Sequence, residues 1–466
     1  MAYLRFHGAA QEVTGSMHLL EWNGHRVALD CGLFQGRRAE AHQKNTTYPC
    51  EPRSLTAVVL SHAHIDHSGK LPRLVKDGFD GPIFATSATR DLAEVMLADS
   101  AHIQLEDTAY FNKKRAKLGE RALEPLYDDD DVQRTVRLFR PMPYDQAFEV
   151  APGVRATFLD AGHLLGSAEV RLELDDGAGR AATVAYSGDL GRFHTPILRD
   201  PTPLPECDYL ICETTYGGRR TGEPDEVRGK LAKILNETFD RGGKVIVPAF
   251  AVGRTQALVY FYHQMLEDGT LRRRAPLYID SPLAVRTTDV FRRHTECYDR
   301  EATAMNSHGD MLDCDRCVYI QDVEESKALH EKRGPLIILS ASGMCETGRI
   351  LHHLKNNCED PKNTILIVGF QAANTLGRRL VEKAPQIKIF GEMYRVKARV
   401  EVLNGLSSHA DAGELQTLTA PLAGRCRRVF LVHGEPDQST AFQESMRKMG
   451  FADVSIPAPG ERVEIA

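Results

Sequence analysis

The segment Ser61-His62-Ala63-His64-Ile65-Asp66-His67 decides how this chain is interpreted. It follows the apolar run Val58-Val59-Leu60, which predicts a buried strand that ends where the histidines begin. The first two histidines project from the same side of an extended backbone, and the aspartate and last histidine follow on the next bend. A solvated histidine patch would explain neither this spacing nor the strand. Because neutral imidazole and carboxylate are ligands that zinc prefers, the segment predicts a site for divalent metal.

Composition indicates an ordinary globular protein. The 466 residues are 42% hydrophobic and 26% charged, which predicts two or more domains with ample core. The N-terminus lacks a signal pattern, and no run of about 18 apolar residues occurs, so we expect no membrane span and a cytoplasmic location. The net charge of -6 gives no global sign of nucleic-acid binding, so any basic surface must be local.

The ten cysteines are scattered along the chain, which favours reduced thiols over a disulfide framework. The segment Cys314-Asp315-Arg316-Cys317 is a lone CxxC with no second pair nearby. A separate zinc site there is an alternative that the spacing alone supports weakly.

The pattern of predicted secondary structure changes near Asp208. Strand and turn patterns precede it, including a predicted strand at 17–22 followed by an Asn-Gly turn. Three units of strand, small-residue loop and helix follow it, which predicts a parallel, Rossmann-like α/β unit. Their strands are expected at 244–249, 336–339 and 364–368. Near Val396 the β-rich pattern resumes, so one domain is interrupted by another, with predicted bounds 1–208, 209–395 and 396–466.

Two polar stretches are interpreted as surface. The run Asp128 to Asp131 is expected to be a solvated loop after a long helix predicted from about Asp91 to Leu118. His352 and His353 lie in the middle of a predicted helix beside Lys355 and are expected to face solvent.

Further polar residues follow apolar strands in the same way as the opening cluster. Each is weak evidence alone, since a single histidine or aspartate at a strand end is usually structural. Together with the opening cluster they supply a plausible ligand set for two metal ions. They are His163, Asp189, His433 and, one strand before the last, His409.

The chain resembles the metallo-β-lactamase fold. His62-Ala63-His64-Ile65-Asp66-His67, His163 and Asp189 are similar to the HxHxDH, histidine and aspartate motifs of that fold. Glu213, His409 and His433 resemble the three additional motifs of its β-CASP group. The nearest similarity is to bacterial and archaeal nucleases akin to the nuclease subunit of the cleavage and polyadenylation specificity factor. The resemblance implies an α/β fold, in which a β-CASP domain is inserted into an αββα sandwich and caps the active site.

The resemblance also implies a ligand set for two Zn²⁺ per chain. One ion is expected on His62, His64 and His163, and the other on Asp66, His67 and His433. Asp189 is expected to bridge both ions. Asp30 matches the family's first motif and is expected to orient the ligand loop.

The implied reaction is hydrolysis of an RNA phosphodiester by metal-activated water. Asp66, Glu213 and His409 are the expected catalytic residues. His409 is the candidate acid for the leaving 3′ oxygen, and Glu213 holds its ring and favours the protonated form. A pair that latches the two domains together is the alternative role for these two residues.

Single-stranded RNA is the expected partner. Helix N-termini after small-residue loops suit phosphates, so Arg254, Ser342 and Thr375 are candidate RNA contacts, although ordinary turns between strand and helix also need small residues. Cutting within the strand and trimming from the 5′ end both stay open, as does a homodimer. No obligate protein partner and no added RNA-binding domain are expected.

Three rival functions remain. The first is a DNA nuclease of the crosslink-repair branch, although a histidine at the position of His433 is typical of RNA-acting members. The second is a small-molecule hydrolase, which would need neither a capping domain nor the Glu213–His409 pair. The third is an inactive binding subunit, although all seven ligand positions are filled here.

Overall fold

The computed structural model describes residues 2–36, 38–222 and 225–465. The chain divides into two compact units. The first unit comprises Met1–Phe193, Asp200–Arg220 and His409–Ala466, and the second comprises His194–Arg199 and Thr221–Ser408. The domain bounds predicted from the sequence, with changes after residues 208 and 395, stay a prediction.

Two seven-stranded sheets form the first unit. One has the order β22 (Arg462–Glu464), β1 (Ala2–Gly8), β2 (Met17–Trp22), β3 (His25–Leu29), β4 (Ala57–Val59), β5 (Ile83–Ala85) and β6 (Phe139–Pro141). The other has the order β21 (Val454–Ser455), β20 (Arg428–Val432), β11 (Tyr209–Glu213), β10 (Ala181–Tyr186), β9 (Ala168–Asp175), β8 (Val154–Asp160) and β7 (Phe148–Ala151).

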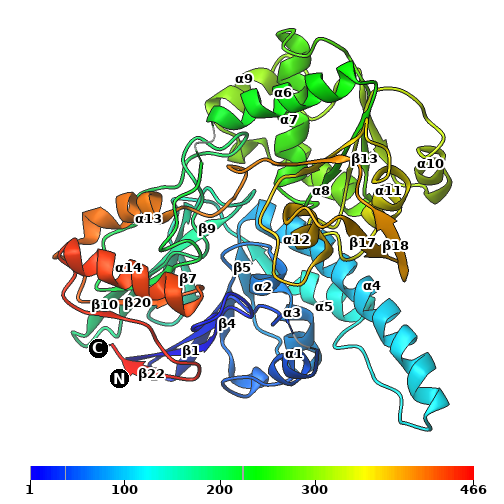
Figure 1. Cartoon of the computed structure of the whole chain (residues 1–466). Coiled ribbons are helices and arrows are strands. Elements are labelled where there is room, and N and C mark those ends of the chain that lie inside the picture. Colours follow the sequence, from blue (N-terminus) through cyan, green and yellow to red (C-terminus); the bar gives the residue numbers. More distant parts are fainter. Residues whose placement is uncertain (1, 37, 223–224, 466) are drawn as a thin grey trace. The chain divides into compact units, whose positions relative to one another are not determined.

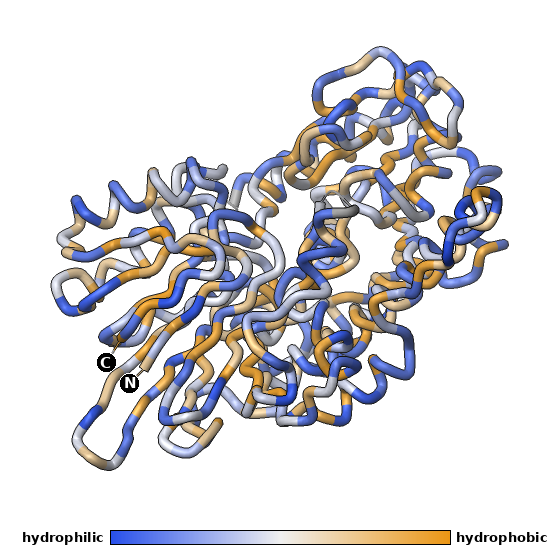
Figure 2. The backbone as a smooth tube through the Cα atoms, turned by 90° about the horizontal axis from the view of Figure 1, so that it is seen from below, coloured by the Kyte–Doolittle hydropathy of each residue, from blue (hydrophilic) through white to orange (hydrophobic). Residues whose placement is uncertain are grey.

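Apolar side chains from both sheets form one buried core, to which Trp22, Phe158 and Phe430 contribute. Strands of this unit carry many hydrophobic residues, as the orange stretches of the backbone show (Figure 2). A shared core between two sheets is the defining feature of a sandwich. The predicted fold class is therefore confirmed.

Helices complete the first unit (Figure 1). On the second sheet, Leu415 and Phe442 of the two C-terminal helices join a second apolar cluster with strand residues such as Leu431. The helices of this unit are α1 (Arg38–Asn45), α2 (Ile65–Ser68), α3 (Leu71–Lys76), α4 (Ser87–Lys117), α5 (Asp129–Leu138), α13 (Ala412–Thr419) and α14 (Pro436–Lys448).

The solvated loop predicted at Asp128 to Asp131 is wrong. These residues begin α5: the Asp128 side chain accepts a hydrogen bond from the backbone N–H of Asp131, whose carboxylate accepts one from the N–H of Asp128. This capping box satisfies backbone donors that the first turn leaves unpaired, and acidic residues there also favour the helix dipole. The acidic run is a helix-start signal.

A six-stranded parallel sheet forms the second unit. Its order is β14 (Cys317–Ile320), β13 (Leu277–Asp280), β15 (Leu336–Ser340), β12 (Lys244–Pro248), β16 (Thr364–Ile367) and β19 (Arg399–Val402). The predicted Rossmann-like unit is therefore confirmed. The sheet includes β19, which the sequence pattern grouped with the returning β-rich segment, because Val400 pairs with Ile365 of β16.

Helices alternate with these strands. They are α6 (Asp225–Asp240), α7 (Arg254–Glu267), α8 (Pro282–Arg293), α9 (Arg300–Asn306), α10 (Val323–Ala328), α11 (Ile350–Asn357) and α12 (Leu376–Val381), and β17 (Gln386–Ile389) pairs with β18 (Glu392–Arg395) in a hairpin. Among the described helices of the chain, none combines the length and apolar character needed to span a bilayer.

The expectation that His353 faces solvent is wrong. Its side chain is buried, and its Nε2 lies 2.6 Å from a carboxylate oxygen of Asp280 at the end of β13. Arg349 and Ser326 donate to the same carboxylate. One polar residue of α11 thus faces the sheet because a buried charge there needs donors.

The expectation of reduced thiols fails at one pair. Cys314 and Cys317 form a disulfide, with their Cα atoms 5.1 Å apart. That separation lies within the range that a disulfide requires, since the turn between them brings the two residues together. Seven of the other eight cysteines are buried.

Gly32 permits a close backbone approach that a larger residue would prevent. A Cβ atom on Gly32 would lie 1.6 Å from the carbonyl oxygen of Asp66. Gly32→Ala should therefore cost about 1–3 kcal/mol through overpacking. Differential scanning calorimetry should show a melting midpoint lowered by about 2–10 °C.

Gly229 in α6 is the matched control, because a Cβ there meets nothing within 4 Å. Gly229→Ala should raise the midpoint slightly, since alanine favours a helix interior by about 1 kcal/mol over glycine. Equal midpoints for Gly32→Ala and the wild type would contradict the close approach.

Candidate metal centre

Parallel strands bring four of the sequence-predicted residues to one edge of the second sheet. β10 and β20 both run parallel to β11, and β8 and β10 are both antiparallel to β9. The carboxyl ends of β8, β10, β11 and β20 therefore lie at the same edge. At or just beyond these ends stand His163, Asp189, Glu213 and His433.

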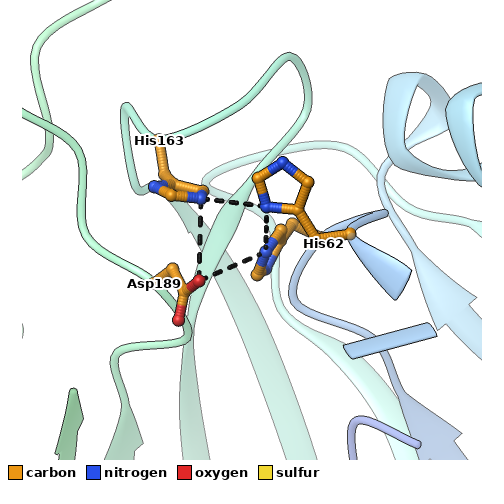
Figure 3. A group of neighbouring side chains, drawn as sticks. His62, His163 and Asp189 are labelled. Carbon is orange, nitrogen blue, oxygen red and sulfur yellow. Dashed lines mark hydrogen bonds and ion pairs between the residues drawn. The ribbon is translucent and has the colours of Figure 1, made fainter. Parts of the chain in front are cut away.

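The first group of donor atoms comes from both sheets. His64 Nδ1 lies 3.1 Å from His62 Nε2 and 3.2 Å from His163 Nε2. Asp189 Oδ2 lies 3.5 Å from His62 Nε2 and 3.6 Å from His163 Nε2 (Figure 3). Ligands about 2.0–2.2 Å from a tetrahedral zinc lie roughly 3.3–3.6 Å from one another. These four side chains are spaced as a tetrahedral ion would hold them.

The second group adjoins the first through Asp189. His67 Nε2 lies 3.1 Å from His433 Nε2, and Asp66 Oδ2 lies 3.6 Å from the same atom of His433. Asp189 Oδ1 lies 3.3 Å from His67 Nε2. Asp189 thus presents one carboxylate oxygen to each group. The structure brings together all seven residues that the sequence predicted as ligands.

The surroundings of the Asp189 carboxylate fit a bound cation. Its Oδ1 is buried and accepts no hydrogen bond of adequate geometry from the described residues. Burial would raise the pKa of Asp189, but the imidazoles around it, His433 first, hold that pKa well below its usual value. An ionised, buried, unsatisfied oxygen is costly unless a cation compensates it.

The protonation states of His62 and His64 fit the same requirement, whereas at His67 Asp189 and Asp30 outweigh burial and raise the pKa well above its ordinary value. Burial lowers the pKa of His62 well below its ordinary value and the pKa of His64 to about 4. Both rings are therefore neutral near pH 7, as metal coordination requires. The donor set fits divalent metal on the chemistry of its nitrogen and carboxylate atoms.

Asp30 organises the histidines from outside the two groups. Its Oδ1 accepts a hydrogen bond from the backbone N–H of Ser61 at 2.7 Å. Its Oδ2 accepts hydrogen bonds from the Ser61 hydroxyl at 2.8 Å and the Tyr186 hydroxyl at 2.6 Å, and lies 2.6 Å from His67 Nδ1. The Ser61 hydroxyl in turn lies 3.1 Å from His62 Nδ1. Asp30 thereby orients one imidazole directly and a second through Ser61.

Glu213 and His409 form a pair beside the first group. Glu213 is fully buried, and its Oε1 lies 3.3 Å from His409 Nδ1. The same carboxylate accepts hydrogen bonds from the backbone N–H groups of Leu190 and Thr215. Burial would lower the pKa of His409, but Glu213 and then Asp189 raise it to about 8. Both members lie in the first unit, and their role, in proton transfer or as a latch, stays a prediction.

Sequence patterns missed three polar residues at the centre. Ser61 and Tyr186 bind Asp30, and the Thr215 hydroxyl lies 3.0 Å from His433 Nδ1, which directs His433 Nε2 toward His67. The only available signal was their position next to strand ends. Serine, threonine and tyrosine are too common there to be singled out.

The predicted RNA contacts lie in the second unit, in the loops after β12, β15 and β16. Arg254 donates a hydrogen bond from Nε to the Leu406 carbonyl. The Ser342 hydroxyl bonds within its own turn to Thr347, and Thr375 caps α12. The last two therefore have local structural roles, whereas the guanidinium of Arg254 retains a charge that such roles do not need.

Three family models match successive parts of the chain. A beta-lactamase superfamily domain matches residues 25–221, and a Beta-Casp domain matches residues 255–380. A Zn-dependent metallo-hydrolase RNA specificity domain matches residues 393–457.

Two similar proteins cover nearly the whole chain. Ribonuclease TTHA0252 of Thermus thermophilus is 36% identical over 459 residues, which are 98% of this chain and 99% of that protein. Transcription termination factor FttA of Methanocaldococcus jannaschii is 30% identical over 463 residues, which are 97% of this chain and 70% of that protein. A solved structure of a protein of unknown function from Enterococcus faecalis V583 has a TM-score of 0.59 at 12% identity and covers 99% of both chains, which shows the fold alone.

Replacing Asp30 with asparagine should weaken metal binding without removing a ligand. The single oxygen of the asparagine amide cannot accept from all the donors around it, so the imidazole of His67 loses its fixed orientation. Substitutions that remove such outer hydrogen bonds cost about 10–100-fold in metal affinity. Spectroscopic titration of the metal-free protein with Co²⁺ measures this change.

Glu21→Gln is the control, since Glu21 is an acidic residue of the neighbouring strand β2 that pairs with Arg462 at the surface. Its Co²⁺ affinity should equal that of the wild type. Unchanged affinity in Asp30→Asn as well would exclude the orienting role of Asp30.

Proposed function

Since the chain belongs to the β-CASP family of the metallo-β-lactamase superfamily, we propose that it is a zinc-dependent ribonuclease that hydrolyses phosphodiester bonds of single-stranded RNA. The observation that carries this proposal is the pair of ligand groups that share Asp189 beside the Glu213–His409 pair. The relative named a ribonuclease matches over its whole length, and the RNA specificity model covers the segment that holds His409 and His433.

Two zinc ions per chain are part of the proposal. His62, His64 and His163 hold one ion, Asp66, His67 and His433 hold the other, and Asp189 contacts both. When bound, such ions lower the pKa of water and neutralise charge on phosphate oxygens. The mutual distances of 3.1–3.6 Å between neighbouring donor atoms within each group support this assignment.

The chain's own contribution to bond cleavage is a proton. Hydrolysis breaks the bond between phosphorus and the 3′ oxygen, and that oxygen must be protonated as it leaves. His409 is the donor in our proposal. Glu213 accepts from Nδ1 of the ring and thereby directs Nε2 away from itself, so Nε2 delivers the proton. The ionised carboxylate of Glu213 also favours the protonated imidazole.

We expect RNA rather than DNA as the substrate, because a histidine at the position of His433 is typical of RNA-acting members. His433 lies in the second ligand group. A small-molecule substrate would leave the second unit without a role. Cytoplasmic location, a homodimer and the choice between internal cleavage and 5′-end trimming stay predictions.

Labelled single-stranded RNA tests the proposed function. Zinc-loaded protein should cleave at least one of two RNAs, one blocked at its 5′ end and one at its 3′ end, and should cleave matched single-stranded DNA far more slowly. The blocked end that stops cleavage reveals the mode of attack. Equal cleavage of DNA, or none of RNA, would reject the proposal.

Elemental analysis tests the metal assignment. The wild type should contain two zinc ions per chain, and a chelator should abolish cleavage. His433→Ala should lose the second ion preferentially and so approach one zinc per chain, because its substitution leaves the first group intact. His102→Ala, at an exposed position of α4, should retain two. One ion in the wild type would refute the two-zinc centre.

His409→Ala tests the proton donor. General acid catalysis contributes about 10²–10⁴-fold, so kcat should fall by that factor while zinc content stays unchanged. A substrate with sulfur in place of the 3′ bridging oxygen should restore most of the rate, because a thiolate leaves without protonation. The substitution His102→Ala should alter neither rate. A deficit of the same size on both substrates would remove His409 from the proton transfer.

A further inference from the structure

The chain leaves the sheet of the second unit in opposite directions at two neighbouring strands. In the order β14-β13-β15-β12-β16-β19, the connection from β12 runs to β13 on one side, and the connection from β16 runs to β19 on the other. In open α/β sheets, ligands bind outside the carboxyl ends of strands at such a switch point, because the two loops part there. The loops after β12 and β16 border this point.

Each of these two loops presents a phenylalanine to solvent. Phe250 is 39% exposed and Phe370 is 52% exposed, although Ala249, Ala251 and Gln371 beside them are buried. Pairing of Ile246 with Ile365 places both rings beyond the same end of the two strands. Exposed aromatic rings offer flat apolar surfaces on which a ligand can stack, and here two of them occur at the same end of neighbouring strands.

The guanidinium of Arg254 contacts the ring of Phe250 and the backbone just before Phe370. The guanidinium carbon of Arg254 is 4.8 Å from the centroid of the Phe250 ring. A Cβ atom on Gly369, the residue before Phe370, would lie 1.9 Å from Arg254 Nη1, so the guanidinium packs directly against that backbone. The Arg254 Nε donates to the Leu406 carbonyl and fixes the side chain in this place.

The loop after β15 supports the arrangement from a third side. A Cβ atom on Gly343 would lie 2.7 Å from Cδ2 of Phe250, so the ring rests on glycine backbone. Gln371 donates from Nε2 to the carbonyls of Gly343 and Gly369, which joins the loop after β15 to the loop after β16. The two exposed rings are therefore held by a hydrogen-bonded framework.

Two exposed aromatic rings beside a cation match the repeating chemistry of single-stranded RNA, which alternates flat bases with phosphates. We propose that Phe250, Phe370 and Arg254 form a base-stacking subsite for single-stranded RNA at the switch point of the second unit. Stacking accepts any base, because every base has a π-face, and the guanidinium supplies the attraction for phosphate. This inference rests on the proposed ribonuclease function and adds a place where the protein binds the RNA strand.

Binding of intact RNA to the full-length, zinc-loaded chain tests the subsite. The His409→Ala background keeps every zinc ligand and slows cleavage, and anisotropy of a labelled single-stranded decamer reports affinity. Stacking is worth about 1–3 kcal/mol per base, so Phe250→Ala and Phe370→Ala should each weaken binding about 5–150-fold. Phe→Tyr at either position should retain affinity, since the ring persists.

An RNA strand without bases separates the contribution of stacking to affinity from the contribution of charge. Decamers with abasic residues should bind the background protein as weakly as normal RNA binds the double variant, and the two phenylalanine substitutions should change abasic binding little. Phe390→Ala is the matched control, because Phe390 is 55% exposed in the same unit, in the turn between β17 and β18. Its affinity for normal RNA should equal that of the background.

Several results would overturn the subsite. Affinity unchanged in the double variant would do so, as would an equal loss on normal and abasic strands. A double variant that dissociates in sedimentation velocity yet binds RNA normally would show that the rings bind a second copy of the chain. The subsite alone fails if the otherwise wild-type enzyme cleaves RNA and the double variant cleaves low concentrations of RNA equally well. The ribonuclease function itself fails, and the subsite with it, if wild-type protein neither binds nor cleaves RNA.

Discussion

The buried carboxylate of Asp30 is the interaction on which the metal centre depends. It forms hydrogen bonds with three parts of the first unit: the loop after β4, His67 on α2, and Tyr186 at the end of β10. A buried charge of this kind is costly unless its oxygens are hydrogen-bonded, and here both oxygens are. Asp30 also adopts a positive φ of 61°, a conformation tolerated only where the surroundings hold it.

The ligand arrangement follows from how the second sheet is built. Four strands that run in one direction end at one edge, so residues far apart in the sequence meet there. Asp189 lies where the two groups adjoin and uses a different oxygen for each. His433, like Asp30, has a positive φ, of 48°, so two positions around the centre carry backbone strain. Strain of this kind is common at functional sites, where it helps to hold side chains ready.

The second unit is built differently from the first. Its parallel sheet places loops and helix starts at the carboxyl ends of the strands, which is the usual place for ligands in α/β folds. The short loops after β12, β15 and β16 pack against one another through glycine backbone and Gln371. Small residues in these loops therefore serve close packing, and the larger residues Phe250 and Phe370 stand out because they are exposed.

How much the sequence predicts depends on whether a signal is local. Strand patterns place β2 at the residues where the structure has it, because alternation and apolar runs are read from neighbouring positions. The acidic run at Asp128 misleads because acidic residues serve both loops and helix caps. His353 misleads because a polar residue is assigned to the solvent face, although it lies three positions after Ile350 on the buried face of α11. Its partner Asp280 is 73 residues away.

By itself, the sequence determined the family, the fold class and the identity of the seven clustered residues, because motifs with tight spacing and strand ends carry that information locally. Only the tertiary structure decided which nitrogen of each imidazole faces the others, that Ser61 and Tyr186 serve Asp30, and that Phe250 and Phe370 border one switch point. These facts depend on strand order and on hydrogen bonds between distant residues. A linear pattern does not specify distances between segments that meet only when the chain folds.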